Sequence, residues 1–163
     1  MAARIDSPNP AGGFRMEAYA ALVLRTGLGV VFVAHALAKL FVFTLPGTAQ
    51  FFEAHGFPGW TAYPVFAAEL VGGGLLVAGV QTRLVSAALL PVMAGAFLVH
   101  WPNGWSFTAP NGGWEYVAFL GAALVTQGLL GDGALALSSR LRLGATAATR
   151  AQAGNTSRPS AAA

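Results

Sequence analysis

The sequence contains no cysteine, and only 9% of its 163 residues are charged. The absence of cysteine excludes disulfides, thiolate catalysis, iron–sulfur ligation and cysteine-bound zinc within this chain. The low charge excludes an ordinary soluble domain, in which about a quarter of the residues are charged. No basic block is interleaved with aromatic residues, so nucleic acid is not an expected partner. With 55% apolar residues and a mean hydropathy of +0.60, the composition indicates an integral membrane protein in contact with the lipid bilayer.

Four apolar runs are long enough to cross a bilayer as helices, which takes about 17–25 residues. None of them alternates apolar with polar residues, so membrane-spanning strands are not expected. The sequence therefore predicts an all-α fold, an integral membrane four-helix bundle that occupies residues 16–138. Its predicted spans are residues 18–43, 62–80, 84–101 and 114–130.

The two ends of the chain differ in composition from this domain. Residues 1–15 are polar and rich in proline and glycine, and residues 139–163 are rich in Ala, Ser, Thr and Arg. Both segments are predicted to be disordered tails. Met16 is an alternative start, since the predicted disorder precedes it. The connection of residues 44–61 is rich in Gly, Pro and aromatic residues and is expected to be a loop.

The basic residues outside the spans predict the orientation of the bundle. The first and third predicted loops contain no Lys or Arg, and by the positive-inside rule this places both termini in the cytoplasm. The tryptophans lie at the opposite, outer ends of the predicted spans, as an interfacial belt would. The basic residues of the two tails and the second loop are Arg4, Arg15, Arg83, Arg140, Arg142, Arg150 and Arg158.

Three ionisable residues, Arg25, His35 and Lys39, interrupt the first apolar run. Such groups cost about 2.5–3.5 kcal/mol at the centre of a span on insertion scales, and they usually mark function. At 100° per residue the three share one helix face, within an arc of about 80°. Arg25 is expected in the inner half of the membrane. There it either reaches lipid phosphates or pairs with Gln127 of the fourth span.

The remaining ionisable residues of the spans are expected in the outer half. Glu69, His100 and Glu115 belong to the second, third and fourth spans, and with His35 and Lys39 they form a predicted polar network. Two interpretations of Glu69 stay open: a salt bridge to a cation of the first span that only holds the helices, or a proton-handling or ligand-binding carboxylate. Lys39 has the alternative of snorkelling to the outer surface.

Small residues next to Glu69 predict a close helix crossing. Ala68 and Gly72 form a small-xxx-small pair, which allows two helix backbones to approach. The histidines His35 and His100 raise the question of haem, but their expected depths differ and haem is not favoured. No metal site is predicted, and no cofactor is established by the sequence alone.

Motifs in three of the four spans resemble those of the DoxX family. The first span contains RTGLGVVFVAHALAKL at residues 25–40, and the second continues as ELVGGGLLVAGVQTRL at residues 69–84. NGGWEY at residues 111–116 and Gly131-Asp132-Gly133 with Leu137 also fit that family. The resemblance covers residues 16–138.

The resemblance implies a small, multi-pass protein of the bacterial inner (plasma) membrane. Members are linked to thiosulfate:quinone oxidoreductase subunits and to membrane redox complexes, although most have no assigned activity. We consider first an accessory or ligand-binding subunit of a redox complex, with redox proteins or further copies of the chain as partners. The alternatives are a quinone-linked oxidoreductase subunit, with Glu69 and His35 as candidate proton carriers, and a small-molecule transporter.

Overall fold

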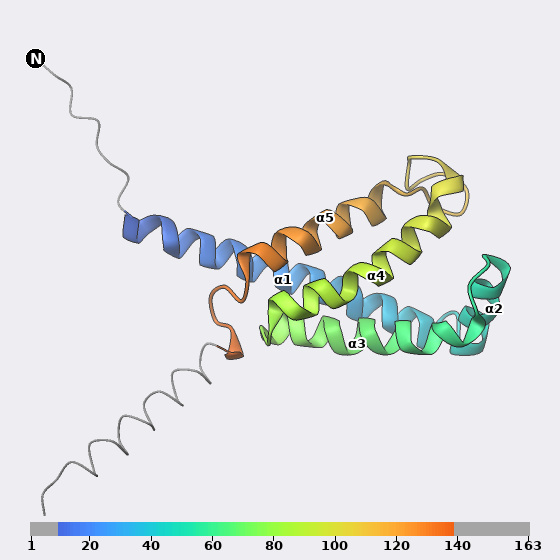
Figure 1. Ribbon diagram of the computed structural model, residues 1–163, viewed down its shortest axis with the longest axis horizontal. Helices are drawn as coiled ribbons and strands as arrows, with labels where there is room; N and C mark the ends of the chain where they lie inside the picture. The colour runs from blue at the N-terminus through green and yellow to red at the C-terminus, as the bar shows by residue number, and fades with distance from the viewer. Residues whose placement is uncertain (1–9, 139–163) are drawn as a thin grey trace, which may run out of the picture.

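The computed structural model describes residues 10–138, which form helices and turns and contain no strand (Figure 1). The all-α class is therefore confirmed for this part of the chain. Three segments are long and apolar enough to cross a membrane, and α5 is a shorter apolar helix of 16 residues. The elements are α1 (Pro10–Phe41), α2 (Leu45–Ala54), η1 (Gly59–Thr61), α3 (Ala62–Ala78), α4 (Thr82–His100), η2 (Trp101–Asn103) and α5 (Glu115–Leu130).

Two segments are more helical than the sequence predicted. α1 begins at Pro10, so residues 10–15 continue the first helix instead of being disordered; proline is well tolerated in a first helical turn. Within residues 44–61, expected to be a loop, lies α2, whose start is capped by Thr44 Oγ1 accepting from the Gly47 amide at 3.2 Å. The predicted C-terminal tail from residue 139 and the first nine residues lie outside the described part of the chain.

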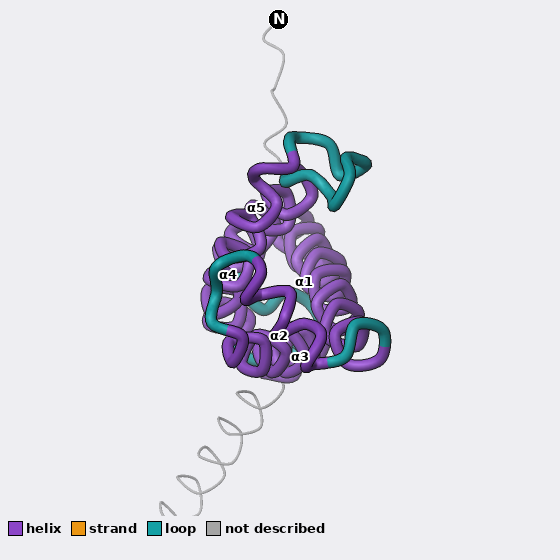
Figure 2. The backbone as a smooth tube through the Cα atoms, turned by 90° about the vertical axis from the view of Figure 1, so that its right-hand side faces the viewer, coloured by secondary structure: helices purple, strands orange, loops and turns teal. Residues whose placement is uncertain are grey.

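The four long helices surround a common axis in the order α1, α3, α4, α5 (Figure 2). α1 packs along α3, and α4 packs along α5. Figure 1 shows that these two pairs diverge towards the end that carries α2, which we call the α2 end. At the opposite end, called the Arg25 end, the Gly79–Gln81 turn joins α3 to α4, with Gly79 in the left-handed conformation that ends α3.

Two glycines set the distance between α1 and α3. A Cβ atom on Gly73 would lie 2.8 Å from the carbonyl oxygen of Gly29, and one on Gly29 would lie 2.6 Å from that of Gly73. The expected close approach beside Glu69 thus exists, but at Gly73 and not at the Ala68 and Gly72 pair. Gly72 instead meets the flexible side chain of Leu89 on α4. The helix phase decides this, because residues 72 and 73 face different neighbours.

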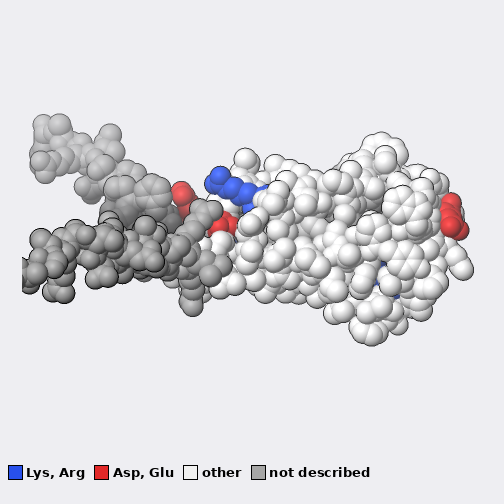
Figure 3. All heavy atoms as spheres, turned by 60° about the horizontal axis from the view of Figure 1, so that its bottom comes forward, with Lys and Arg blue, Asp and Glu red and all other residues white. Residues whose placement is uncertain are grey.

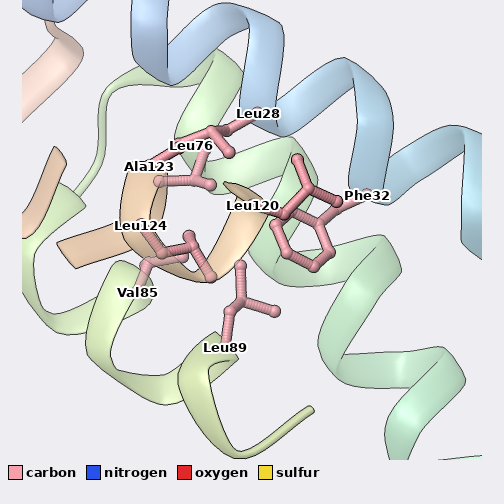
Figure 4. Close-up of a cluster of buried hydrophobic side chains, with 8 residues drawn as sticks. All are labelled: Leu28, Phe32, Leu76, Val85, Leu89, Leu120, Ala123 and Leu124. Carbon is pink, nitrogen blue, oxygen red and sulfur yellow. The ribbon is translucent and has the colours of Figure 1, made fainter. Parts of the chain in front are cut away.

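The hydrophobic core draws on α1, α3, α4 and α5 (Figure 4). It lies nearer the Arg25 end, since Leu76 and Val85 are close to the turn between α3 and α4. Its side chains fill the space between the two helix pairs, so the pairs are held together here and separate beyond it. The cluster consists of Leu28 and Phe32 of α1, Leu76 of α3, Val85 and Leu89 of α4, and Leu120, Ala123 and Leu124 of α5.

The outer surface of the bundle is apolar. Figure 3 shows a broad band of uncharged atoms between charged groups near the two ends. Large apolar side chains face outward from every long helix, among them Val23 at 72% exposure, Phe119 at 69% and Leu129 at 76%. An exposed apolar surface of this extent is unusual for a soluble protein and fits a lipid environment.

Candidate functional site

A cavity of about 1120 Å³ lies between the two helix pairs at the α2 end. Phe32 and Leu120 of the core line its floor. Aromatic side chains from α2 and the loops line its upper wall: Phe43, Phe51, Phe52, Phe57 and Phe107. The polar side chains of the lining are His35, Lys39, Thr48, Thr61, Glu69, His100 and Tyr116. A mostly apolar pocket with a few convergent polar groups is typical of a small-molecule site.

Lys39 and Glu69 form an ion pair across α1 and α3. Lys39 Nζ donates to Glu69 Oε1 at 2.9 Å and to Oε2 at 2.6 Å. The Glu69 side chain is 4% exposed and that of Lys39 is 15% exposed. Glu69 therefore forms the salt bridge to a cation of the first helix that one of its two interpretations expected. Lys39 points inward to this carboxylate and does not snorkel to the outer surface. The pair also lines the cavity, so holding the helices and binding a ligand are compatible roles.

His35 extends the polar lining along α1 towards α5. Its Nδ1 lies 2.8 Å from the carbonyl oxygen of Val31, one turn earlier. Its ring stacks on Tyr116 of α5, with centroids 6.4 Å apart and an interplanar angle of 22°. The two rings therefore bridge α1 and α5 at the side of the cavity, where the helix pairs diverge.

His100 reaches the cavity from the end of α4. Its Nδ1 lies 3.0 Å from the carbonyl oxygen of Gly112 in the following loop. Asn103 donates to the same carbonyl at 2.9 Å, so the 104–113 loop is tied back to the end of α4. Four residues of the predicted network, His35, Lys39, Glu69 and His100, line this one cavity.

Two residues of the predicted network lie elsewhere. Glu115 is not among the residues that line the cavity; its Oε1 accepts from the Phe107 amide at 2.9 Å and so fastens the loop to the start of α5. Gln127 is fully buried, but its Nε2 donates to the carbonyl of Gly131 at 2.8 Å, and its Oε1 accepts no hydrogen bond from Arg25. Both side chains have local backbone partners close by, which sequence spacing alone did not reveal.

Arg25 is buried at the opposite end of the bundle, at 1% exposure, and does not reach a lipid surface. Its guanidinium donates to the carbonyl oxygens of Leu76 at 2.9 Å, Val77 at 2.6 Å and Ala134 at 3.0 Å. The first two belong to the last turn of α3, where the helix dipole favours a cation. The Leu76 carbonyl also accepts from the Gly79 amide at 3.1 Å. Arg25 therefore joins α1, α3 and the segment after α5.

Asp132 organises the same end around the start of α4. Its Oδ1 accepts from the Thr82 amide at 3.0 Å, and its Oδ2 accepts from Ser138 Oγ at 2.9 Å. Ser138 Oγ also lies within hydrogen-bond distance of the Gly79 carbonyl, at 2.6 Å. Asp132 adds an attractive charge interaction with Arg25. The Gly131-Asp132-Gly133 segment is thus a helix cap and a partner of the buried arginine.

Sequence reasoning missed three polar residues of the cavity. Tyr116 follows the candidate Glu115 by one position, and 100° of helix rotation turns it towards His35 while Glu115 faces the loop. Thr48 and Thr61 lie in a segment expected to be an irregular loop. The only signal available was the density of aromatic residues around them, which indicated a packed segment.

Comparisons with known proteins agree with the motifs. The sequence model of the DoxX family matches residues 20–101, which include Arg25, His35, Lys39, Glu69 and His100 but not Tyr116. The chain is 38% identical over 77 residues to "Putative oxidoreductase CatD" of Bacillus subtilis (strain 168). That alignment covers 47% of this chain and 56% of the relative, so the chain spans just over half of the relative's length. No solved structure matches this chain.

Proposed function

Because this chain belongs to the DoxX family, we propose that it is a four-span membrane protein whose cavity binds a quinone-like or lipid-like molecule. In this proposal it serves as an accessory subunit of a redox complex in the bacterial plasma membrane. The observation that carries the proposal is the cavity itself: about 1120 Å³, mostly apolar, with an ion pair and two histidines in its wall.

The four-span topology rests on α5 in addition to the three longer helices. Its 16 residues extend over about 24 Å, slightly less than a bilayer core, and α5 packs along α4. The loops at the α2 end carry no Lys or Arg, which supports cytoplasmic termini.

The absence of cysteine makes this topology easy to test. Exposed Thr108 lies at the α2 end and exposed Gln81 at the Arg25 end. In intact spheroplasts, a membrane-impermeant maleimide should label Thr108→Cys and label Gln81→Cys only after lysis. The reverse pattern would place both termini outside, and equal labelling of the two would contradict the four-span arrangement.

Ligand binding is tested by filling the cavity without straining the helices. Gly95 of α4 lines the cavity, and a Cβ atom there would meet nothing within 4 Å. Gly95→Leu should therefore reduce co-purification of a bound quinone or lipid, measured by native mass spectrometry, by about tenfold or more. Gly74→Leu is the matched control, because Gly74 is equally open but lies outside the cavity lining. A wild-type protein that purifies empty would count against the proposal.

Two observations support the accessory role. The chain contains no cysteine, and the relative in Bacillus subtilis carries the name of an oxidoreductase. A redox partner would then supply the electron-transferring group. Gentle purification followed by mass spectrometry of the accompanying proteins should identify an oxidoreductase subunit, whereas a solitary protein would argue against a complex.

A quinone-linked oxidoreductase subunit is the second candidate, and the Lys39–Glu69 pair favours it. Glu69 and His35 line the same cavity and could pass protons to a bound quinone, with Lys39 opposing the charge that develops. The test is quinone reduction in proteoliposomes with thiosulfate or another donor. Full activity of Glu69→Gln would exclude this proton path.

A further inference from the structure

The polar side chains of the cavity have already used most of their hydrogens on the protein. Both histidine rings place Nδ1 against a backbone carbonyl, Val31 for His35 and Gly112 for His100. A carbonyl oxygen can only accept, so each Nδ1 carries the hydrogen. In the neutral ring, Nε2 then holds a lone pair and is an acceptor. Within the described residues, no protein group bonds either Nε2.

The two threonines of the lining also donate their side-chain hydrogens to backbone carbonyls. Thr48 Oγ1 donates to the carbonyl of Thr44 at 2.9 Å, and Thr61 Oγ1 donates to that of Pro58 at 2.6 Å. Each hydroxyl has one hydrogen, and after these bonds only the oxygen lone pairs remain. The threonine oxygens can therefore accept from a ligand but cannot donate to it.

The ion pair and Tyr116 leave few donors. Lys39 Nζ has three hydrogens, and two of its bonds go to Glu69, so one hydrogen is left. The Glu69 carboxylate retains lone pairs and only accepts. The Tyr116 hydroxyl can act in either direction. Acceptors therefore outnumber donors clearly among the side chains that line the cavity.

From this balance we infer that the cavity selects ligands that donate hydrogen bonds, and that it binds a hydroquinone or phenol head group more tightly than the corresponding quinone. The inference rests on the proposed ligand cavity and names the chemical class of its occupant. The two carbonyl oxygens of a quinone can only accept hydrogen bonds, so they would mostly face side-chain atoms of the cavity that can also only accept. A hydroquinone can donate both hydrogens to the wall and still accept from Lys39. A bound quinone would leave the acceptors of the cavity without a donor, and the cost of such unpaired polar groups is what lets a site discriminate between two ligands.

The experiment compares three compounds with the same alkyl tail: a 1,4-hydroquinone, its quinone, and its dimethyl ether. The ether keeps the ring and oxygens of the hydroquinone but has no hydrogen to donate. Binding to the full-length protein in nanodiscs is measured anaerobically by calorimetry. The hydroquinone should bind about tenfold or more tightly than either other compound.

Substitution of the two acceptors locates the effect. His35→Phe with His100→Phe should lower hydroquinone affinity about tenfold and leave the ether affinity unchanged, which also reports an intact cavity. His55→Phe is the matched control: His55 Nδ1 makes the same kind of bond, 2.7 Å to the Phe51 carbonyl, but His55 does not line the cavity.

The outcomes separate the inference from the proposed function. If the quinone or the ether binds as tightly as the hydroquinone, the inference is overturned while the ligand cavity stands. If the double variant keeps the full preference, the histidines are not its source and the inference is likewise overturned. If none of the three compounds binds, both the inference and the proposed cavity function fail.

Discussion

Arg25 and Lys39 lie on the same helix and the same face, yet their hydrogen-bond partners and their surroundings differ. Arg25 is 1% exposed and donates to three backbone carbonyls. Lys39 donates to the carboxylate of Glu69 and borders a cavity of about 1120 Å³. At the Arg25 end a Cβ atom on Gly79 would lie 2.8 Å from Arg25 Cζ, so the guanidinium is packed tightly against the turn that ends α3.

The difference separates a structural charge from a candidate functional one. A cation that donates to the ends of neighbouring segments joins those segments and is enclosed by them. A cation in an ion pair at a cavity wall keeps a free hydrogen and open space before it. The following substitutions test this distinction, from the largest expected effect to the smallest.

Arg25→Met should be the most destabilising. It removes three hydrogen bonds, one buried and two partly buried, and leaves two terminal carbonyls of α3 without this donor. We expect a loss of about 3–5 kcal/mol, measured by detergent-induced unfolding with circular dichroism. Arg83→Met, at an exposed position, should change stability by less than about 0.5 kcal/mol. If Arg25→Met and Arg83→Met were equally stable, Arg25 would not have the structural role described here.

Gly73→Ala should come next, because its Cβ would meet backbone atoms of α1 at 2.8–2.9 Å. Backbone cannot move aside as a side chain can, so α1 and α3 must separate, at a cost of about 1–3 kcal/mol. The adjacent Gly74→Ala meets nothing within 4 Å and should be neutral or stabilising by up to about 1 kcal/mol. Two alanine variants of the same stability would disprove the close crossing at Gly73.

The Lys39–Glu69 pair is tested by a double-mutant cycle. Lys39→Met and Glu69→Leu should each destabilise, whereas the double variant should recover most of the loss. We expect a coupling of about 1–2 kcal/mol, below that of a fully buried pair because Lys39 borders the cavity. Additive effects would show that the pair contributes nothing to stability.

Asp132→Ala should have the smallest effect of the four. It removes the acceptor for the Thr82 amide and for Ser138 Oγ. Loss of a helix cap costs about 1 kcal/mol, observable as a shift in the same unfolding curve. Asp132→Asn keeps a side-chain oxygen and should retain part of this stability, and a loss equal to that of alanine would show that charge, not capping, matters.

The apolar runs were sufficient to predict the helices because hydropathy follows directly from residue type. The predicted spans agree with α1, α3, α4 and α5 to within a few residues, apart from the start of α1 at Pro10. α2 was missed because its Gly- and Pro-containing sequence has weak helical signals. The site was predicted in part: His35, Lys39, Glu69 and His100 line one cavity, while Glu115 and Gln127 bond locally.

The sequence by itself determined the fold class, the membrane environment and the set of ionisable residues inside the spans. Those properties depend on composition and on the helical period. Only the tertiary structure decided which side chains pair and where space remains. The Gly29–Gly73 crossing and the divergence of the two helix pairs are properties of packed backbones. For that reason, the assignment of Arg25 to a closed junction and of Lys39 to an open cavity required coordinates.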